Sequence, residues 1–155
     1  AAAWARDTMG ITLYEWLQQL YVKYGFFREG LVNVVRKGKD GAAEIQQMMV
    51  DYRQNPPKSI LGSPVVKILD YKTLEELDVA TGAKKPIEGI DDKSNVLQWI
   101  TEDGTKVSVR PSGTEPKIKF YFGVKAKLES VDKFDETLAA LDQKIEDIKV
   151  ELKLV

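Results

Sequence analysis

The sequence predicts an α+β domain: an antiparallel sheet of about four to five strands with two helices packed on one face, preceded by a helical segment. The elements follow the order strand, helix, several strands, helix, which is typical of a two-layer α+β domain. Residues 96–110 form a predicted hairpin, and hairpins belong to antiparallel sheets. The chain has 155 residues, of which 43% are hydrophobic, so it can bury a core of its own.

The N-terminal segment is predicted to be helical. Thr12 and Glu15 have the spacing of a capping box, and Gly25 follows the last apolar residue as a stop signal. Between them, apolar and aromatic residues recur at helical spacing: Leu13, Trp16, Leu17, Leu20, Tyr21 and Tyr24. Such a stripe indicates a face that packs on a core more often than one that binds a ligand, and left exposed it would favour self-association.

We assign residues 1–26 to the helical tail of a preceding domain or to an interdomain linker, and residues 27–155 to one domain. The chain opens with Ala1-Ala2-Ala3-Trp4-Ala5 and no methionine, which suggests a cut within a longer protein. A processed natural N-terminus is the alternative interpretation.

The first half of the main domain contains a strand at 31–36 and a helix that Asp40 or Gly41 can cap and that runs to about Arg53, where Asn55-Pro56-Pro57 ends it. The glycines at 38 and 41 suggest a phosphate loop, but the Gly-Lys-Ser/Thr ending is missing, so we interpret this turn as a helix cap. A second strand is predicted at 65–71. Residues 73–95 are polar and are predicted to form a long surface excursion.

The second half contains strands at 96–101, 105–110 and 117–124. Asp103-Gly104 predicts a two-residue turn between the first two of these strands. A long helix is predicted from about Ser130, with an apolar seam that favours packing on the sheet over a coiled coil. The seam consists of Val131, Phe134, Leu138, Leu141, Ile145 and Ile148. Residues 150–155 either extend this helix or fray.

The loop that follows Arg110 carries groups suited to an oxyanion. Arg110 offers a planar fork of donors, and Ser112 and Thr114 offer hydroxyl groups. Gly113 is expected to turn the backbone with a positive φ, so that successive N–H groups point into one concavity. The prolines at 111 and 116 stiffen both ends and lower the cost of ordering the loop on binding.

The strands on either side of this loop alternate apolar and polar residues, so Arg110, Lys117 and Lys119 are expected to share one face near the loop. Three cations beside hydroxyl groups would form a pocket for a dianion. The alternative is a plain hairpin with a solvated basic face, since Ser, Gly, Thr and Pro are ordinary turn residues.

The net charge of the chain is −1, so the surface as a whole does not attract nucleic acid or acidic lipid. Any binding of anions must therefore depend on a local cluster of positive charge. The chain contains no cysteine, so neither a disulfide framework nor a thiolate metal site is expected. No apolar run approaches a membrane span of about 20 residues. We expect no nucleic-acid or membrane partner, and a cytoplasmic protein.

Residues 110–121, Arg-Pro-Ser-Gly-Thr-Glu-Pro-Lys-Ile-Lys-Phe-Tyr, closely resemble the phosphate-binding signature of the α-D-phosphohexomutases, the phosphoglucomutase/phosphomannomutase family. That signature belongs to the family's fourth, C-terminal domain. Residues 20–25 are similar to the end of the third domain, and residues 38–42 to the start of the first helix of the fourth. The resemblance implies a TATA-binding-protein-like fold for residues 27–155.

The resemblance also implies a function. Family members interconvert hexose 1-phosphate and hexose 6-phosphate through a bisphosphate intermediate, and this loop holds the phosphate that is not reacting. Carried over by position, the phosphate contacts are Arg110, Ser112, Gly113, Thr114 and Lys119, with Lys117 a less certain member. Glu115 is not expected to contact the ligand, because its carboxylate would repel phosphate, but to orient Arg110 or a neighbouring lysine.

Other parts of the family's machinery are missing from this sequence. It contains no histidine, so the Ser-His-Asn motif of the phosphoserine is absent, as are the Asp-Gly-Asp metal loop and the Gly-Glu-Glu sugar-reading loop. No catalytic residue and no metal ligand are therefore expected in this chain. Mg²⁺ and hexose bisphosphate are implied for the parent enzyme, and the partners are a phosphosugar and the remaining domains.

Two other functions stay open from the residues alone. One is a stand-alone phosphate-binding or anion-binding module. The other is an interaction domain that works through the aromatic stripe of residues 13–24 or through the C-terminal seam. Preference for glucose or mannose is not encoded here, because the sugar-reading loop is absent.

Overall fold

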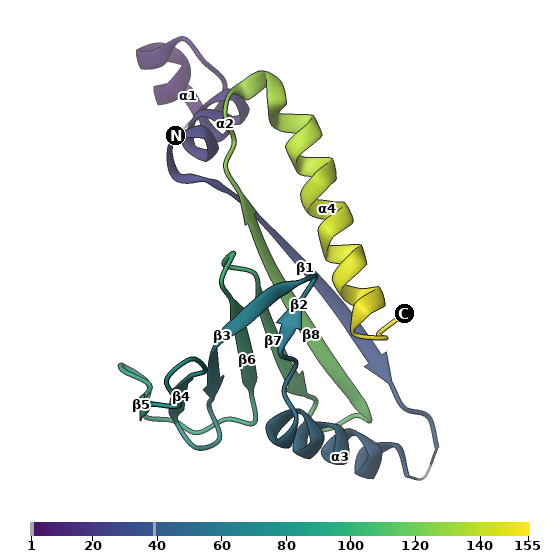
Figure 1. The fold of residues 1–155 in the computed structure, drawn as a ribbon. Helices are drawn as coiled ribbons and strands as arrows, with labels where there is room; N and C mark the ends of the chain where they lie inside the picture. Colours follow the sequence, from purple (N-terminus) through teal and green to yellow (C-terminus); the bar gives the residue numbers. More distant parts are fainter. Residues whose placement is uncertain (1, 39) are drawn as a thin grey trace.

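The computed structural model describes residues 2–38 and 40–155, which form an antiparallel sheet with helices α3 and α4 on one face (Figure 1). The strand order is β1-β8-β7-β6-β3-β4-β5, with β2 paired to β3, and every pairing is antiparallel. The predicted α+β class is confirmed. The strands are β1 (Phe26–Val35), β2 (Ser59–Ile60), β3 (Ser63–Asp70), β4 (Glu75–Asp78), β5 (Lys84–Pro86), β6 (Leu97–Thr101), β7 (Lys106–Pro111) and β8 (Lys117–Ala126).

The sheet is larger than the four to five strands expected from the sequence. The polar segment 73–95 contributes β4 and β5, which pair with each other and extend the sheet beyond β3. Strand β1 also begins at Phe26, not at residue 31, because β8 is long enough to pair with its whole length, down to Phe26 opposite Ala126. The β1–β8 pairing joins segments far apart in the sequence, so local patterns do not reveal its extent. Strands β4 and β5 pair with their neighbours along the chain, but they are short and polar and lack the apolar alternation that predicts a strand.

The core lies between the sheet and helices α3 (Gly41–Gln54) and α4 (Phe134–Glu151). Alternate residues of β8 are fully buried on this face: Ile118, Phe120, Phe122 and Val124. Leu141, Ile145 and Ile148 of α4 join the same cluster, so the predicted apolar seam packs on the sheet and does not form a coiled coil. A Cβ atom at Gly30 of β1 would lie 2.8 Å from the Ile145 side chain, so glycine there allows α4 to approach closely.

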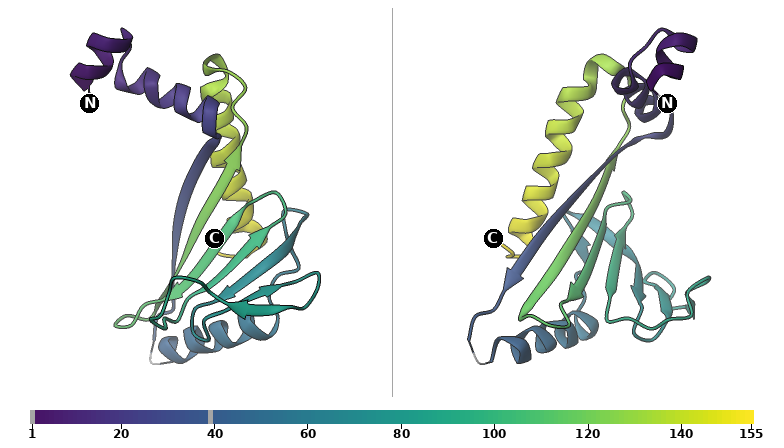
Figure 2. Two further views of the ribbon diagram at one scale, coloured as in Figure 1. Left: turned by 90° about the vertical axis from the view of Figure 1, so that its left-hand side faces the viewer. Right: turned by 180° about the vertical axis from the view of Figure 1, so that it is seen from behind.

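The N-terminal segment comprises α1 (Ala2–Trp4), a π-helical turn η1 (Ala5–Met9) and α2 (Leu13–Tyr24), and lies beyond the end of the sheet farthest from α3 (Figure 2). The capping box is confirmed: the N–H of Glu15 donates to Thr12 Oγ1 at 3.2 Å, and the N–H of Thr12 donates to Glu15 Oε2 at 2.7 Å. Gly25 ends α2 with a φ of 98°.

Aromatic stacking joins this segment to the main domain. The ring centroids of Tyr21 and Phe26 are 4.4 Å apart, and those of Phe26 and Phe134, at the start of α4, are 4.8 Å apart. No residue of α2 is buried, and Leu13, Leu17, Leu20 and Tyr24 are exposed. The assignment of residues 1–26 to a separate unit stays a prediction, and the start of the chain at Ala1 lies outside the described residues.

The predicted start of α3 is confirmed, because Asp40 occupies the N-cap position and the helix begins at Gly41, although the Asp40 side chain makes no capping hydrogen bond. Gly41 is required at this start, because a Cβ atom there would lie 2.2 Å from the carbonyl oxygen of Arg36. Lys39 lies outside the described residues.

The prediction of a two-residue turn between β6 and β7 was wrong, because the turn is longer. The N–H of Thr101 donates to the carbonyl of Thr105 at 3.0 Å, which leaves residues 102–104 in the turn, with Gly104 at a φ of 82°.

Helix α4 follows a short 3₁₀ turn, η2 (Val131–Lys133), and ends at Glu151, so residues 152–155 do not extend it. Arg28 of β1 and Asp142 of α4 form an ion pair with two hydrogen bonds, of 2.6 and 3.3 Å, on the side of the sheet that the helices cover. The residues of β1, β8 and β7 that alternate with the helix-facing ones lie on the opposite, outward face of the sheet.

Candidate phosphate-binding site

The candidate site is the loop of residues 112–116, which connects the neighbouring strands β7 and β8. The N–H of Ser112 donates to the carbonyl of Lys117 at 2.8 Å, and the N–H of Lys117 donates to the carbonyl of Glu115 at 2.7 Å. The carbonyl of Pro116 accepts the N–H of Arg36, just after β1, at 3.0 Å. These bonds hold the loop at the end of the β1-β8-β7 ladder.

Strand register brings Arg110 directly opposite Lys119, and Asn33 of β1 lies on the other side of Lys119. Their neighbours Val109 and Phe120 are fully buried beneath the helices, so Arg110 and Lys119 project from the opposite face, as the alternation predicted. Within residues 2–38 and 40–155, neither cation forms an ion pair with a carboxylate.

These two cations border a hollow of about 160 Å³. Its lining consists of Arg110, Pro111, Ser112, Gly113, Lys119 and Tyr121. We call it the clamp hollow. It gathers the guanidinium fork, a lysine and a hydroxyl group, which are the donors that suit a phosphate dianion. Tyr121 was absent from the sequence-based candidates, although strand alternation placed it on the same face as Lys119.

Thr114 and Lys117 lie outside the clamp hollow. Thr114 borders a second hollow, of about 420 Å³, between the loop and the first turns of α3, together with Gly38 and Ala42. Lys117 is ion-paired with Glu115. A hydrogen bond from Lys117, aided by its charge, holds the pKa of Glu115 below the usual value. Glu115 thus contacts the neighbouring lysine, in line with the expectation that it orients a cation.

The expectation for Gly113 was wrong in its backbone geometry. The glycines with positive φ are Gly10, Gly25, Gly38, Gly62, Gly82, Gly89 and Gly104, and Gly113 is not among them. The loop closes through the Ser112–Lys117 hydrogen bond without a left-handed residue. A Cβ atom at Gly113 would have no neighbour within 4 Å, so the fold itself leaves space there. A missing side chain of this kind allows a ligand to approach the backbone closely.

The described part of the chain contains no group of three or more His, Cys, Asp or Glu residues that could hold a metal ion. None of its helices combines the length and the hydrophobicity needed to cross a membrane. The lining of the clamp hollow itself offers positive charge from Arg110 and Lys119 and a hydroxyl donor from Ser112.

The fold and the loop together define a class of protein: an α+β domain in which a basic loop with hydroxyl groups connects two adjacent strands. The family model described as phosphoglucomutase/phosphomannomutase, C-terminal domain, matches residues 31–141, and the chain belongs to this family. The match includes the loop of residues 112–116, strands β2 to β8, helix α3 and the first part of α4. It confirms the family resemblance seen in residues 110–121.

Curated relatives agree. The chain is 34% identical over 134 residues to a phosphoglucomutase of Staphylococcus saprophyticus, which covers 86% of this chain and 23% of that protein. It is 36% identical over 116 residues to a phosphoglucomutase of Staphylococcus aureus strain MRSA252, covering 75% of this chain and 20% of that protein. The chain thus spans about a fifth of the length of these relatives.

Among solved structures, the chain is similar to the exocytosis-sensitive phosphoprotein pp63/parafusin, a phosphoglucomutase from Paramecium, in its open form. The TM-score is 0.45 and the identity 15%, over 89% of this chain and 23% of that one. This similarity is too low to support a structural conclusion.

Proposed function

We propose that this chain is the substrate-phosphate-binding domain of a phosphohexomutase, and that the clamp hollow holds the phosphate that is not reacting. The parent enzyme would be an isomerase that interconverts hexose 1-phosphate and hexose 6-phosphate through a bisphosphate intermediate. The observation that carries this proposal is the pair Arg110 and Lys119, opposed across the ladder beside Ser112 and without carboxylate partners in the described chain. Membership of the family supports it.

The physical role follows from the donors present. Arg110 can form two parallel hydrogen bonds to a phosphate, Lys119 adds a point charge, and Ser112 adds a hydroxyl donor. None of these groups recognises the sugar, so this loop accepts the substrate in both of its orientations. We include Thr114 and Lys117 among the proposed phosphate contacts because the family signature contains them. Since they lie outside the clamp hollow, the loop would have to close on the ligand for them to reach the phosphate.

A clamp of this kind supplies positioning, while phosphoryl transfer also needs a nucleophile and stabilisation of developing charge. We assign the phosphorylated serine, the Mg²⁺ site and the sugar-reading loop to other domains of the parent enzyme. The described residues offer no ligand cluster for Mg²⁺. The 155-residue chain alone should bind phosphate and should not convert glucose 1-phosphate to glucose 6-phosphate.

The remaining domains of the parent enzyme are the proposed partners, together with a phosphosugar. The exposed apolar residues Leu13, Leu17, Leu20 and Tyr24 of α2 support this, because a stripe of this kind is usually covered. We place the enzyme in the cytoplasm and propose neither a nucleic-acid nor a membrane partner.

An NMR titration of the ¹⁵N-labelled chain with inorganic phosphate tests the location of the site. The largest amide shifts should fall on Ser112 to Glu115, with a dissociation constant in the millimolar range, equivalent to about −4 kcal/mol. If the largest shifts fall on residues 38–41 and the first turn of α3, phosphate binds in the 420 Å³ hollow and the clamp assignment is wrong.

A pair of variants sharpens this experiment. Arg110→Gln should abolish the shifts at Ser112 to Glu115. Arg28→Gln removes another exposed arginine, one that is paired with Asp142 on the helix-covered side, and should leave the titration unchanged. Equal loss in both variants would indicate a general effect of net charge and not a specific clamp.

A further inference from the structure

A third hollow, of about 190 Å³, lies beside the clamp hollow on the same face of the sheet. Its lining consists of Glu29, Gly30, Lys106, Ser108, Tyr121, Phe122 and Gly123. We call it the Gly123 hollow. Tyr121 lines both hollows, and the two are therefore neighbours along β8. Nothing in the family signature of residues 110–121 extends to Glu29, Lys106 or Gly123.

The Gly123 hollow exists because one side chain is missing. In the strand register, Gly123 of β8 lies between Glu29 of β1 and Lys106 of β7. A Cβ atom at Gly123 would meet only the Cβ of Lys106, at the ordinary contact distance of 3.7 Å. The neighbouring residues of the domain thus leave this space open, although the fold has room for a larger residue.

The groups around this space form a mixed set of donors and acceptors. Glu29 offers a carboxylate and Lys106 an ammonium group, and neither is ion-paired to any other described residue. Ser108 Oγ accepts a hydrogen bond from Gln98 at 2.7 Å, which leaves its own proton free to donate. Tyr121, a residue that is 38% exposed, adds an aromatic ring.

This mixture suits a polyol better than a second phosphate. Sugar hydroxyl groups both donate and accept hydrogen bonds, whereas the carboxylate of Glu29 would repel a phosphate group. The aromatic ring of Tyr121 gives the apolar C–H side of a sugar a surface to cover. Two residues along a strand span about 7 Å, so a ring above Tyr121 would lie one such step from the row of Arg110 and Lys119.

We propose that the Gly123 hollow and Tyr121 form a subsite for the sugar ring of a bound hexose phosphate. The phosphate occupies the clamp hollow, the ring lies over Tyr121, and its hydroxyl groups point toward Ser108, Lys106 and Glu29. This inference rests on the proposed function, since the phosphate must first be held by Arg110 and Lys119. It adds ring contacts to a domain whose signature accounts for phosphate alone.

The test compares two ligands, inorganic phosphate and glucose 6-phosphate, by NMR titration of the 155-residue chain. Glucose 6-phosphate should bind several-fold more tightly than phosphate. It should also shift the amide signals of Tyr121 and Gly123, whereas phosphate alone should leave those signals unchanged. Gly123→Val fills the hollow with a residue that strands favour. In this variant the two ligands should bind equally, with the affinity for phosphate unchanged.

The control is Phe27→Val, which introduces the same residue on the same face of the sheet but in β1, opposite Lys125, at a position that lines neither hollow. This variant should still bind glucose 6-phosphate more tightly than phosphate. If Gly123→Val fails to fold, Tyr121→Ala replaces it, with the same selective loss of the sugar contribution expected.

The outcomes separate the two proposals. If wild-type chain binds phosphate but binds glucose 6-phosphate no more tightly, the ring subsite is wrong and the clamp stands. The same holds if Gly123→Val and Tyr121→Ala leave the preference for the sugar phosphate intact. If neither ligand shifts any amide of residues 110–123, both the clamp and the ring subsite fail.

Discussion

Arg110 of β7 and Lys119 of β8 lie directly opposite each other in the antiparallel ladder, next to the loop of residues 112–116. Like charges in this position destabilise a pair of strands. Within the described chain no carboxylate forms an ion pair with either of them. The repulsion is thus retained in the free domain, and a bound dianion would relieve it.

The first prediction concerns Arg110 in the full-length parent enzyme. Arg110→Lys keeps the charge but loses the bidentate fork. We expect kcat/KM to fall by an amount equivalent to about 1–3 kcal/mol of transition-state stabilisation, similarly for glucose and mannose phosphates. Steady-state kinetics with both sugars measure this, and the melting temperature should barely change, because Arg110 is exposed.

The matched control is Arg28→Lys, which breaks the fork of another exposed arginine, to Asp142 on the other side of the sheet, and should leave kcat/KM unaffected. A kinetic loss confined to one of the two sugars would show that Arg110 reads the sugar and not the phosphate.

The second prediction concerns Lys119. Lys119→Thr removes the repulsion with Arg110 and introduces a residue with high strand propensity. Without phosphate, the variant should be more stable than wild type by about 0.2–1 kcal/mol, measured by urea denaturation. Added phosphate should stabilise the wild-type domain and have little effect on the variant. A variant that is less stable without phosphate, and still stabilised by it, would contradict the clamp.

The third prediction uses the corrected geometry of Gly113. Because Gly113 lacks a positive φ and has open space around it, Gly113→Ala should leave the free energy of unfolding unchanged or raise it by up to about 1 kcal/mol. Phosphate binding should weaken, since the new methyl group occupies the approach to the backbone. Gly62 also has open space but a φ of 77°, so Gly62→Ala should destabilise the fold and leave phosphate binding intact.

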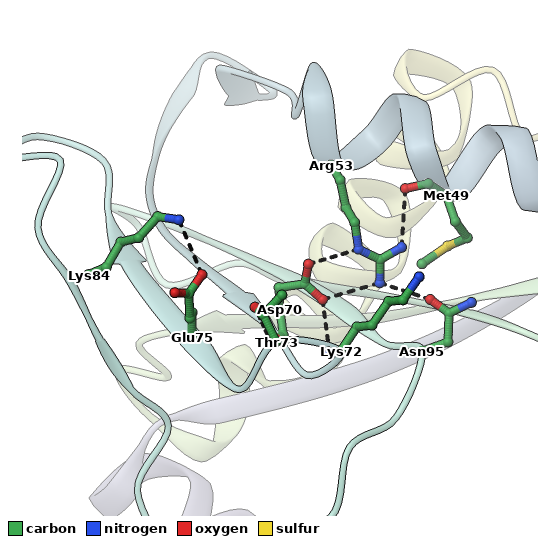
Figure 3. Close-up of polar contacts among 8 residues, drawn as sticks. All are labelled: Met49, Arg53, Asp70, Lys72, Thr73, Glu75, Lys84 and Asn95. Carbon is green, nitrogen blue, oxygen red and sulfur yellow. Dashed lines mark hydrogen bonds and ion pairs between the residues drawn. The ribbon is translucent and has the colours of Figure 1, made fainter.

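The fourth prediction concerns a polar cluster on the helix-covered face (Figure 3). Arg53 of α3 forms two hydrogen bonds with Asp70 of β3, at 2.8 and 3.1 Å, and a third with Asn95 at 2.8 Å. Both charged side chains are only 19% exposed. Asp70→Ala would leave the largely buried Arg53 without its counter-charge and should cost about 2–4 kcal/mol of stability in urea denaturation.

Glu75 and Lys84 provide the control for that experiment, because they border the same region but are 45% and 60% exposed (Figure 3). Glu75→Ala should cost less than about 1 kcal/mol. In the double variant Arg53→Met with Asp70→Ala, much of the loss should be recovered. Failure to recover it would show that Asp70 acts mainly through its bond to the N–H of Lys72.

The fifth prediction concerns acid stability. Partial burial alone would raise the pKa of Asp103, but hydrogen bonds from Lys144, Thr101 and the N–H of Thr105 outweigh burial and hold that pKa well below its ordinary value. The unfolded chain therefore takes up the proton first, so Asp103 stabilises the fold fully above about pH 4 and loses this effect as the pH falls further.

Asp103→Asn should lower stability at pH 7 and flatten the decline in stability below about pH 4, as measured by thermal melts across pH 2 to 7 in steps of about one unit. Asp132 is exposed, and its pKa is also lowered, chiefly by the Ser130 side chain, so Asp132→Asn is the comparison and should flatten the decline less than Asp103→Asn does. Parallel pH profiles for wild type and Asp103→Asn would rule out the assigned contribution.

Local chemistry in the sequence was enough to predict several features. The capping box of Thr12 and Glu15 forms as expected, Gly25 ends α2, and the alternation in β8 separates buried Phe120 from outward Lys119. Each depends only on residues a few positions apart. The same alternation placed Arg110 and Lys119 on one face, which is the basis of the clamp.

Features that depend on distant segments were decided by the tertiary structure. Phe26 joins β1 because Ala126, far away in the sequence, lies opposite it. Two shorter-range features also differed from the prediction: β4 and β5 form a hairpin beside β3 although their residues are polar, and the Ser112–Lys117 hydrogen bond closes the loop without a positive φ at Gly113. The Gly123 hollow arises only where Glu29 and Lys106, far apart in sequence, flank a glycine. By itself, the sequence determined which side of each strand its residues occupy, since that depends on a two-residue period. Register between strands decided which residues became neighbours, because it is set by packing of the whole sheet on α3 and α4.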